Sequence, residues 1–257
     1  MDSVRGAQLK PARQERLLAR ERRVATITIA TVAAWTLAGL FVDRYLDLRG
    51  QVFLGVFTCA VLAALLWLHE PAARLQALAV VAIASLGEVI GSLVWGVYSY
   101  RLHDLPAFVP PGHGLVYLGG MALATLAGRR FDSLLLGCAA VGAAAWGVAG
   151  MTVLPRLDVS GAIGCTFLLV VLVWTRRPVY AGVFLVVAGL ELYGTALGTW
   201  TWQAAVPGLR LPQGNPPSGA ASGYVVFDVL ALALLAQLVR AARMRPFAAW
   251  RRIAFSR

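Results

Sequence analysis

Apolar segments recur along this chain, and each covers roughly 17 to 26 residues, the length that a helix needs to cross a hydrocarbon core of about 30 Å. The 257 residues are 59% hydrophobic, which is too apolar for an ordinary soluble domain of this size. The sequence therefore predicts an all-α polytopic membrane protein. We expect about eight transmembrane helices, at residues 24–42, 51–68, 75–100, 113–128, 133–153, 159–175, 179–202 and 222–240.

The formal net charge of +11 would suit a nucleic-acid partner, but the placement of the charges favours a membrane. If the N-terminus lies in the cytoplasm, 18 of the 23 Lys and Arg residues fall in cytoplasmic segments, as the positive-inside rule requires. We therefore expect a multi-pass protein of the inner (plasma) membrane with both termini in the cytoplasm. Its basic ends would contact anionic membrane lipid, and we expect no nucleic-acid partner. Because the first 23 residues are polar and basic, we also expect no cleavable signal.

A glutamate followed by small residues, aromatic residues and a proline-rich loop occurs twice. The first copy reads EVIGSLVWGVYSY from Glu88 to Tyr100, and the second reads ELYGTALGTWTW from Glu191 to Trp202. The simplest explanation is duplication of a four-span unit, and an even number of spans gives both copies the same orientation. The predicted organisation is a basic cytoplasmic segment, two parallel four-helix repeats and a basic cytoplasmic tail, at residues 1–23, 24–128, 133–240 and 241–257.

The two glutamates are candidate catalytic residues, because an ionisable group at membrane depth is costly. No Lys or Arg lies within a predicted span except Arg240, the last residue of the final one, so the sequence offers Glu88 and Glu191 no ion-pair partner. An isolated carboxyl in a low dielectric prefers its neutral form, which suits a general acid and equally a proton-coupled carrier. Ser92 and Thr195 lie one helical turn further on, where their hydroxyls can reach the carboxyls. A glutamate that only hydrogen-bonds neighbouring helices is the alternative.

Two further candidates break the repeat. Asp228 in the last predicted span has no acidic counterpart in the first copy, and His113 has no counterpart in the second. Either residue could remove a proton or orient water, and we favour Glu191 with Asp228 over Glu88 with His113 as the catalytic pair. An interfacial histidine and a buried, hydrogen-bonded aspartate are the alternatives.

Aromatic residues beside the glutamates alternate along the sequence. An interfacial belt of Trp and Tyr would explain them. The same rings could instead line a pocket for a polyene or stabilise a developing carbocation. We find no metal-ligand spacing and no cofactor motif, so we expect neither a metal nor a cofactor. The residues expected to contact a hydrophobic small-molecule substrate are Ser92, Trp95, Tyr98, Tyr117, Thr195, Trp200, Trp202, Asn215 and Tyr224.

The first copy resembles the bacterioruberin-type hydratase family of carotenoid biosynthesis, in which an acidic helix runs into a G-x-Y-x-Y pattern and a Val-Pro loop. The second copy is similar to the membrane lycopene cyclase domain, in which a G-x-W stretch precedes Leu-Pro and a pair of acids. Asn215 and its neighbours stand where that acidic pair would be. The resemblance implies chemistry on a polyisoprenoid. The comparable residues are Glu88, Gly91, Gly96, Tyr98, Tyr100, Val109, Pro110, Leu211 and Pro212.

Three functions remain open at this point. The first is a membrane enzyme that performs hydration, isomerisation or cyclisation of an isoprenoid or carotenoid-like lipid. The second is a proton-coupled transporter, and the third is an assembly partner without a reaction of its own. An apolar pocket joining Glu191 to Asp228 would favour the enzyme, whereas a polar path from the cytoplasm to the glutamates would favour transport.

Overall fold

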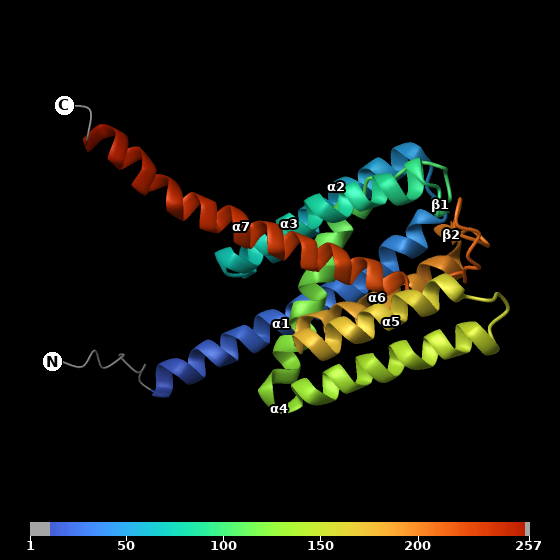
Figure 1. Cartoon of the computed structure of the whole chain (residues 1–257), viewed down its shortest axis with the longest axis horizontal. Helices are drawn as coiled ribbons and strands as arrows, with labels where there is room; N and C mark the ends of the chain where they lie inside the picture. The colour runs from blue at the N-terminus through green and yellow to red at the C-terminus, as the bar shows by residue number, and fades with distance from the viewer. Residues whose placement is uncertain (1–10, 255–257) are drawn as a thin grey trace.

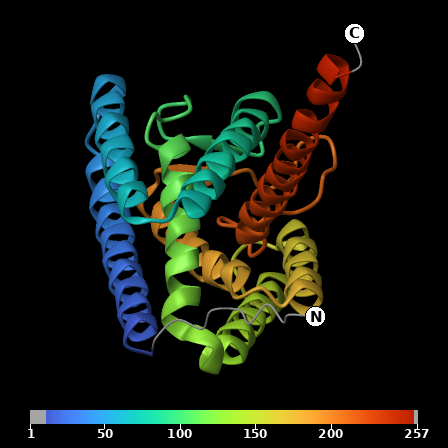
Figure 2. The same cartoon turned by 90° about the vertical axis from the view of Figure 1, so that its left-hand side faces the viewer.

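The computed structural model describes residues 11–254, and the side chains of residues 13–240. It consists of helices with one short pair of strands (Figures 1 and 2). The predicted basic segment at 1–23 begins outside the described residues, and the side chains of the predicted tail at 241–257 also lie outside them. The elements are α1 (Pro11–Asp43), α2 (Leu48–Leu68), α3 (Pro71–Glu88), η1 (Val89–Val94), β1 (Tyr98–Tyr100), α4 (Val109–Thr152), α5 (Val159–Thr175), α6 (Pro178–Leu197), β2 (Trp200–Trp202) and α7 (Ala220–Ala254).

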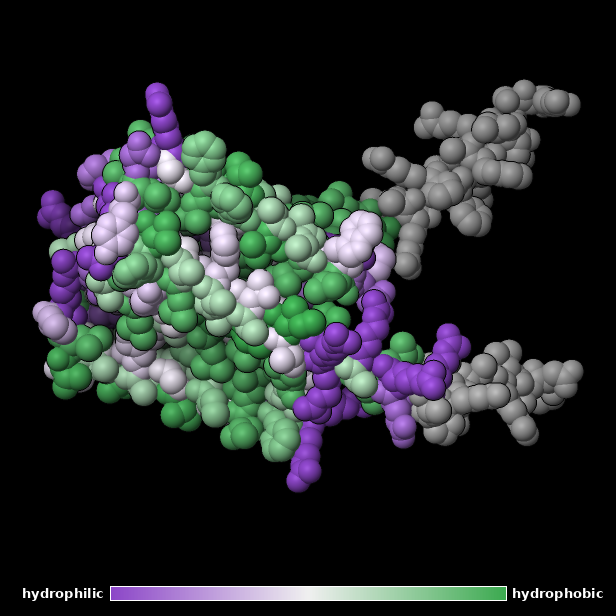
Figure 3. Space-filling model, turned by 180° about the vertical axis from the view of Figure 1, so that it is seen from behind, coloured by the Kyte–Doolittle hydropathy of each residue, from purple (hydrophilic) through white to green (hydrophobic). Residues whose placement is uncertain are grey.

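The helices carry apolar side chains on their outer surfaces as well as in the core. On α2, Phe53 is 68% exposed and Trp67 is 79% exposed. Figure 3 shows a broad hydrophobic surface between two hydrophilic ends. Among the described residues, 6 helices are long and apolar enough to cross a membrane by length and composition, and α5 is a shorter apolar helix. The bundle is thus compatible with a multi-pass membrane protein.

Helix α4 is bent at Gly128, whose φ of 62° and ψ of 169° are not helical. Glycine reaches this conformation easily because it has no Cβ. The predicted spans at 113–128 and 133–153 lie on the two sides of this bend. Arg129 and Arg130 follow it directly, at one end of the bundle.

The predicted spans at 75–100 and 179–202 are wrong at their C-terminal ends. The π-helix η1 ends at Val94 and α6 ends at Leu197. Gly96 (φ 72°) and Gly198 (φ 75°) then turn the chain in a left-handed conformation that glycine tolerates. The aromatic residues that follow form strands β1 and β2 instead of the last helical turns.

The two strands pair antiparallel, although they come from distant parts of the sequence. Tyr98 lies opposite Trp202, and Tyr100 lies opposite Trp200. Figure 1 shows the strands at one end of the bundle, with the start of α1 and the bend of α4 toward the other. An ion pair at this second end, between Arg20 and Glu70 at 3.0 Å, joins α1 to the turn before α3.

The first part of α4 lies at the centre of the bundle (Figure 2) and packs against α1, α3 and α6. Its crossing with α6 is close because Gly120 faces Gly182, and a Cβ on either residue would overlap the backbone of the other helix. Such small-residue contacts allow helices to pack tightly in lipid. This crossing fixes α6, and therefore Glu191, against the helix that carries His113.

Candidate functional site

A cavity of about 480 Å³ lies among helices α1, α2, α3, α4, α6 and α7, next to the strand pair. Its lining includes the carboxyls of Glu88 and Glu191 and the imidazole of His113. Most other lining residues are aliphatic or aromatic. This is the combination of an apolar enclosure with a few convergent polar groups that small-molecule sites use. The aromatic residues outside the strands are Trp35, Trp95, Phe108, Tyr224 and Phe227.

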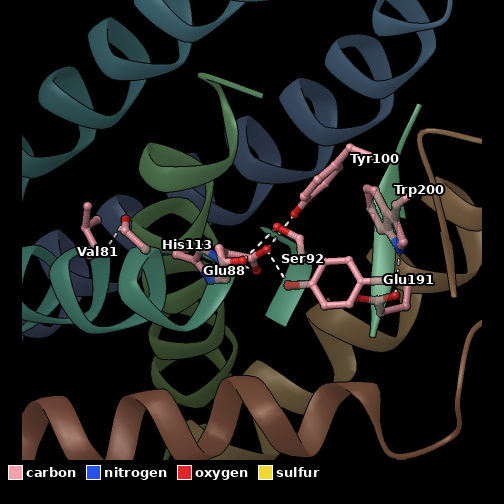
Figure 4. A network of polar contacts seen from close by, with 9 residues as sticks. Val81, Glu88, Ser92, Tyr100, His113, Glu191 and Trp200 are labelled. Atoms are coloured by element: carbon pink, nitrogen blue, oxygen red, sulfur yellow. Dashed lines mark hydrogen bonds and ion pairs between the residues drawn. The ribbon is translucent and has the colours of Figure 1, made fainter. Parts of the chain in front are cut away.

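Glu88 ends α3 and is only 3% exposed. Its Oε2 accepts hydrogen bonds from the hydroxyls of Tyr98 at 2.6 Å and Tyr100 at 2.7 Å. Its Oε1 lies 2.9 Å from Nε2 of His113 (Figure 4). The sequence offered this glutamate no Lys or Arg, and the structure places a histidine beside it instead, which forms an ion pair when it is protonated. Three polar partners satisfy its carboxyl group, which is the environment that a buried carboxylate requires.

Glu191 is buried to the same degree, at 2% exposure, but its partners differ. Its Oε2 accepts hydrogen bonds from the indole nitrogens of Trp200 at 2.9 Å and Trp202 at 3.1 Å. Its Oε1 makes no hydrogen bond to any residue that the structure describes. Since indole N–H groups only donate, the second oxygen is left to carry a proton or to contact a ligand.

The strand pair explains why aromatic residues alternate in both copies. Side chains two residues apart on a strand point to the same face, so both tyrosines turn toward Glu88 and both tryptophans toward Glu191. The ring centroids of Tyr98 and Trp202 lie 4.5 Å apart, and those of Tyr100 and Trp200 lie 6.2 Å apart. All four rings line the cavity. The strand pair thus links the two glutamates through a continuous group of aromatic rings.

Glycines in the two motifs make room for these rings. A Cβ on Gly194 would overlap the indole of Trp200, and a Cβ on Gly91 would lie 3.2 Å from the hydroxyl of Tyr98. A Cβ on Gly87 would overlap the ring of Phe227 on α7. Gly87, Gly91 and Gly194 therefore serve close packing, and two of them do so against rings of the strand that follows.

Two of the predicted contacts take a different form in the structure. The hydroxyl of Ser92 donates to the backbone carbonyl of Glu88 at 2.7 Å, and that of Thr195 donates to the carbonyl of Glu191 at 2.6 Å. Ser and Thr in helices commonly bond the carbonyl four residues earlier, because that acceptor is the nearest one. Helical spacing alone predicts a bond from each hydroxyl to the carboxyl. Neither hydroxyl makes that bond.

Asp228 does not join Glu191. It is 2% exposed on α7, it is not among the residues that line the cavity, and its Oδ2 has no hydrogen-bond partner among the described residues. Tyr117 also lies outside the lining, and its hydroxyl donates to Oε1 of Gln76 at 3.1 Å. The structure therefore brings Glu191 together with Glu88 and His113 instead of with Asp228.

The remaining predicted substrate contacts lie at or beside the cavity. The ring of Tyr224 is 4.8 Å from that of His113, and both line the cavity. Trp95 also lines it and donates from its indole to the carbonyl of Pro207 at 2.9 Å. Asn215 has a supporting position, because its Oδ1 accepts from the backbone N–H of Trp202 at 2.9 Å.

Two buried polar residues that sequence reasoning missed hold the strands in place. Asp158 is fully buried and accepts from the backbone N–H groups of Gly214 at 2.8 Å and Ser218 at 2.6 Å. Gln213 donates to the carbonyls of Val97 at 3.1 Å and Gln203 at 3.2 Å. The position of Asp158 before an apolar run is a helix N-cap signal, but nothing local indicates its bonds to the second proline-rich loop.

The part of the chain that the structure describes contains no group of three or more His, Cys, Asp or Glu residues placed to hold a metal ion. Comparison with known proteins gave no family model, no curated protein and no solved structure that matches this chain. Its chemistry is therefore argued from the cavity itself.

Proposed function

We propose that this chain is a multi-pass membrane enzyme that performs acid–base chemistry on a double bond of an isoprenoid or carotenoid-like lipid. The observation that carries this proposal is the cavity, in which two buried carboxyls and an imidazole face an otherwise apolar, aromatic-rich space. An apolar ligand fits such a lining, and aromatic faces stabilise a positive charge that develops on it.

The different hydrogen bonds of the two glutamates support different roles. Glu191 donates a proton from Oε1 to one carbon of the double bond, which leaves a carbocation on the other carbon. Trp200 and Trp202 hold the carboxyl through Oε2, so that Oε1 is directed to the ligand. The rings that line the cavity face the cation. A positioned general acid of this kind accelerates proton transfer.

Glu88 and His113 together receive the proton that leaves. In an isomerisation or cyclisation, a neighbouring carbon loses a proton to this pair and a new double bond forms. In a hydration, water adds to the cation and the pair takes one of its protons. A proton that returns from the pair to Glu191 restores the starting state, so no other reactant is consumed.

A transporter would need a polar path from an end of the bundle to the glutamates. At the strand end, the lining residues Tyr100, Phe108 and Trp200 are all buried, and deeper in the bundle Leu115 and Val116 are buried as well. These positions are aromatic or aliphatic and add no ionisable group that could carry protons to the glutamates. They therefore favour an enzyme over a proton-coupled carrier.

We also propose that the chain crosses the membrane eight times, as two parallel four-helix repeats. The bend at Gly128 divides α4 into two helical parts, and α5 supplies a further apolar helix. The pairing of β1 with β2 supports duplication, because it brings the same segment of the two motifs together and is centred on the corresponding residues Ser99 and Thr201. The basic residues in the first turns of α1 and those after the bend of α4 favour a cytoplasmic location for the end of the bundle that holds them.

The test compares lipid extracts of cells that produce wild-type protein, Glu191→Gln or Glu88→Gln, together with a strain that lacks the chain. Asp228→Asn is the matched control, because Asp228 is a buried acid outside the cavity. We expect an isoprenoid product that is present with wild type and with the control but lost with both glutamine variants. Unchanged isoprenoid profiles in both glutamine variants would overturn the enzyme proposal. If proton flux is then measured across liposomes that contain the protein, and it requires both acids, the protein is a transporter instead.

A further inference from the structure

Two of the residues that line the cavity are also well exposed on the protein surface. Ile90 and Trp95 are each 47% exposed, and they are the only lining residues in the exposed class. Both belong to the same short stretch, since Ile90 lies in η1 and Trp95 follows it directly. Every other lining residue is buried or half-buried. An opening of the cavity to the surface is therefore expected beside η1.

The stretch around this opening faces the side of the bundle. Leu93 is 52% exposed and Val94 is 76% exposed, and both are apolar residues of η1 that do not line the cavity. An exposed apolar surface on a membrane-spanning helix lies against lipid. The π-helical winding of η1 is itself a feature that recurs at functional sites, because it displaces backbone and side chains from the regular helical path.

The groups that line the cavity restrict what can bind there. The lining contains two acids and a histidine but no Lys or Arg, so a phosphate or carboxylate group would meet two acidic groups, and the histidine is already bonded to one of them. The volume of about 480 Å³ lies within the usual range of small-molecule sites, roughly 300–1,000 Å³. The site thus suits an apolar chain end rather than a charged headgroup.

We propose that the cavity opens sideways into the bilayer beside η1, and that it takes the apolar, unsaturated end of a long lipid whose remainder stays in the membrane. This inference rests on the proposed function for its substrate class, but the route of access is a separate property. Ile90 and Trp95 form the rim of the opening, and the bond from Trp95 to Pro207 holds one side of it in place.

Access can be measured without turnover, with full-length protein in lipid nanodiscs. Cys59, Cys138 and Cys165 are first replaced by serine, and Val116→Cys then places one thiol of similar size in the buried lining. A maleimide with a long alkyl chain is dissolved in the bilayer, and a charged, membrane-impermeant maleimide is added to the water. Labelling of the single thiol is followed over time by mass spectrometry.

We expect the alkyl maleimide to label the thiol and the charged reagent to leave it unmodified. Adding Ile90→Trp should slow labelling about tenfold, which corresponds to about 1.4 kcal/mol of added barrier. Leu93→Trp is the matched control, because it adds the same bulk to η1 outside the lining, and it should leave the rate unchanged. Leu54→Cys on α2 provides a second buried thiol if the Val116→Cys protein does not fold.

Two results would overturn the inference. Equal labelling rates with Ile90→Trp and Leu93→Trp would place the route elsewhere in the bundle. Rapid labelling by the charged reagent would show access from water. Glu191→Gln, added to the Val116→Cys protein, should leave the labelling rate unchanged. A loss of catalysis in this variant would therefore not be mistaken for a loss of lateral access.

Discussion

The Glu88 half of the site (α3, η1 and β1) and the Glu191 half (α6 and β2) share one plan but differ in hydrogen bonding. In each half a glutamate near the end of a helix is bonded by two aromatic residues of the strand that follows. Hydroxyls bond Glu88 and indoles bond Glu191, and only Glu88 has a histidine. Two similar halves thus produce two different acids in one cavity, which is the condition for separate donor and acceptor roles.

The largest effect is expected from Glu191→Gln. The amide oxygen can still accept from both indoles, so the fold should persist, but the proton at Oε1 is lost. We expect activity to fall about 10²–10⁴-fold, as for the loss of a general acid. Conversion of the lipid in nanodiscs measures this loss. An active Glu191→Gln protein would remove the difference between the two halves.

A smaller effect is expected from Tyr100→Phe, which removes one donor to Glu88. A hydrogen bond to a charged group contributes about 1.5–3 kcal/mol, so the variant should be destabilised by that amount. Tyr193→Phe is the matched control, because the hydroxyl of Tyr193 bonds the backbone carbonyl of Leu37 at 3.1 Å. Chemical unfolding in detergent compares the two. Equal losses would argue against a charged Glu88.

Packing in the Glu191 half can be tested with Gly194→Ala. The added methyl would overlap the ring of Trp200, so β2 must move and the protein should lose about 1–3 kcal/mol of stability. Gly189→Ala on the same helix meets no atom within 4 Å and should be neutral. If both variants unfold alike, the close contact between helix and strand is not what positions Glu191.

The smallest effect is expected from Asp228→Asn. The side chain keeps its size and the residue lies outside the cavity, so we expect the rate of lipid conversion to remain close to that of wild type. A loss comparable to that of Glu191→Gln would restore the pairing expected from sequence and contradict the pairing of Glu191 with Glu88 and His113.

The helical segments could be predicted from sequence because length and hydropathy decide which runs can cross a membrane. The repeated glutamate motif also indicated where polar groups converge. The reversal after each motif helix was missed, although Gly96 and Gly198 are residues that favour such turns. Pairing of Tyr98 with Trp202, and of Glu88 with His113, depends on contacts across the bundle, and local patterns do not contain that information.

The most direct test of the central claim is infrared spectroscopy of the protein in nanodiscs. An Asp228→Asn background removes a further buried acid, whose Oδ2 has no hydrogen-bond partner among the described residues. The claim is that Glu191 holds a proton while Glu88 is the carboxylate beside His113. We expect a protonated-carboxyl C=O band that disappears with Glu191→Gln and persists with Glu88→Gln. A band that disappears with Glu88→Gln and persists with Glu191→Gln would contradict the assignment of the two roles.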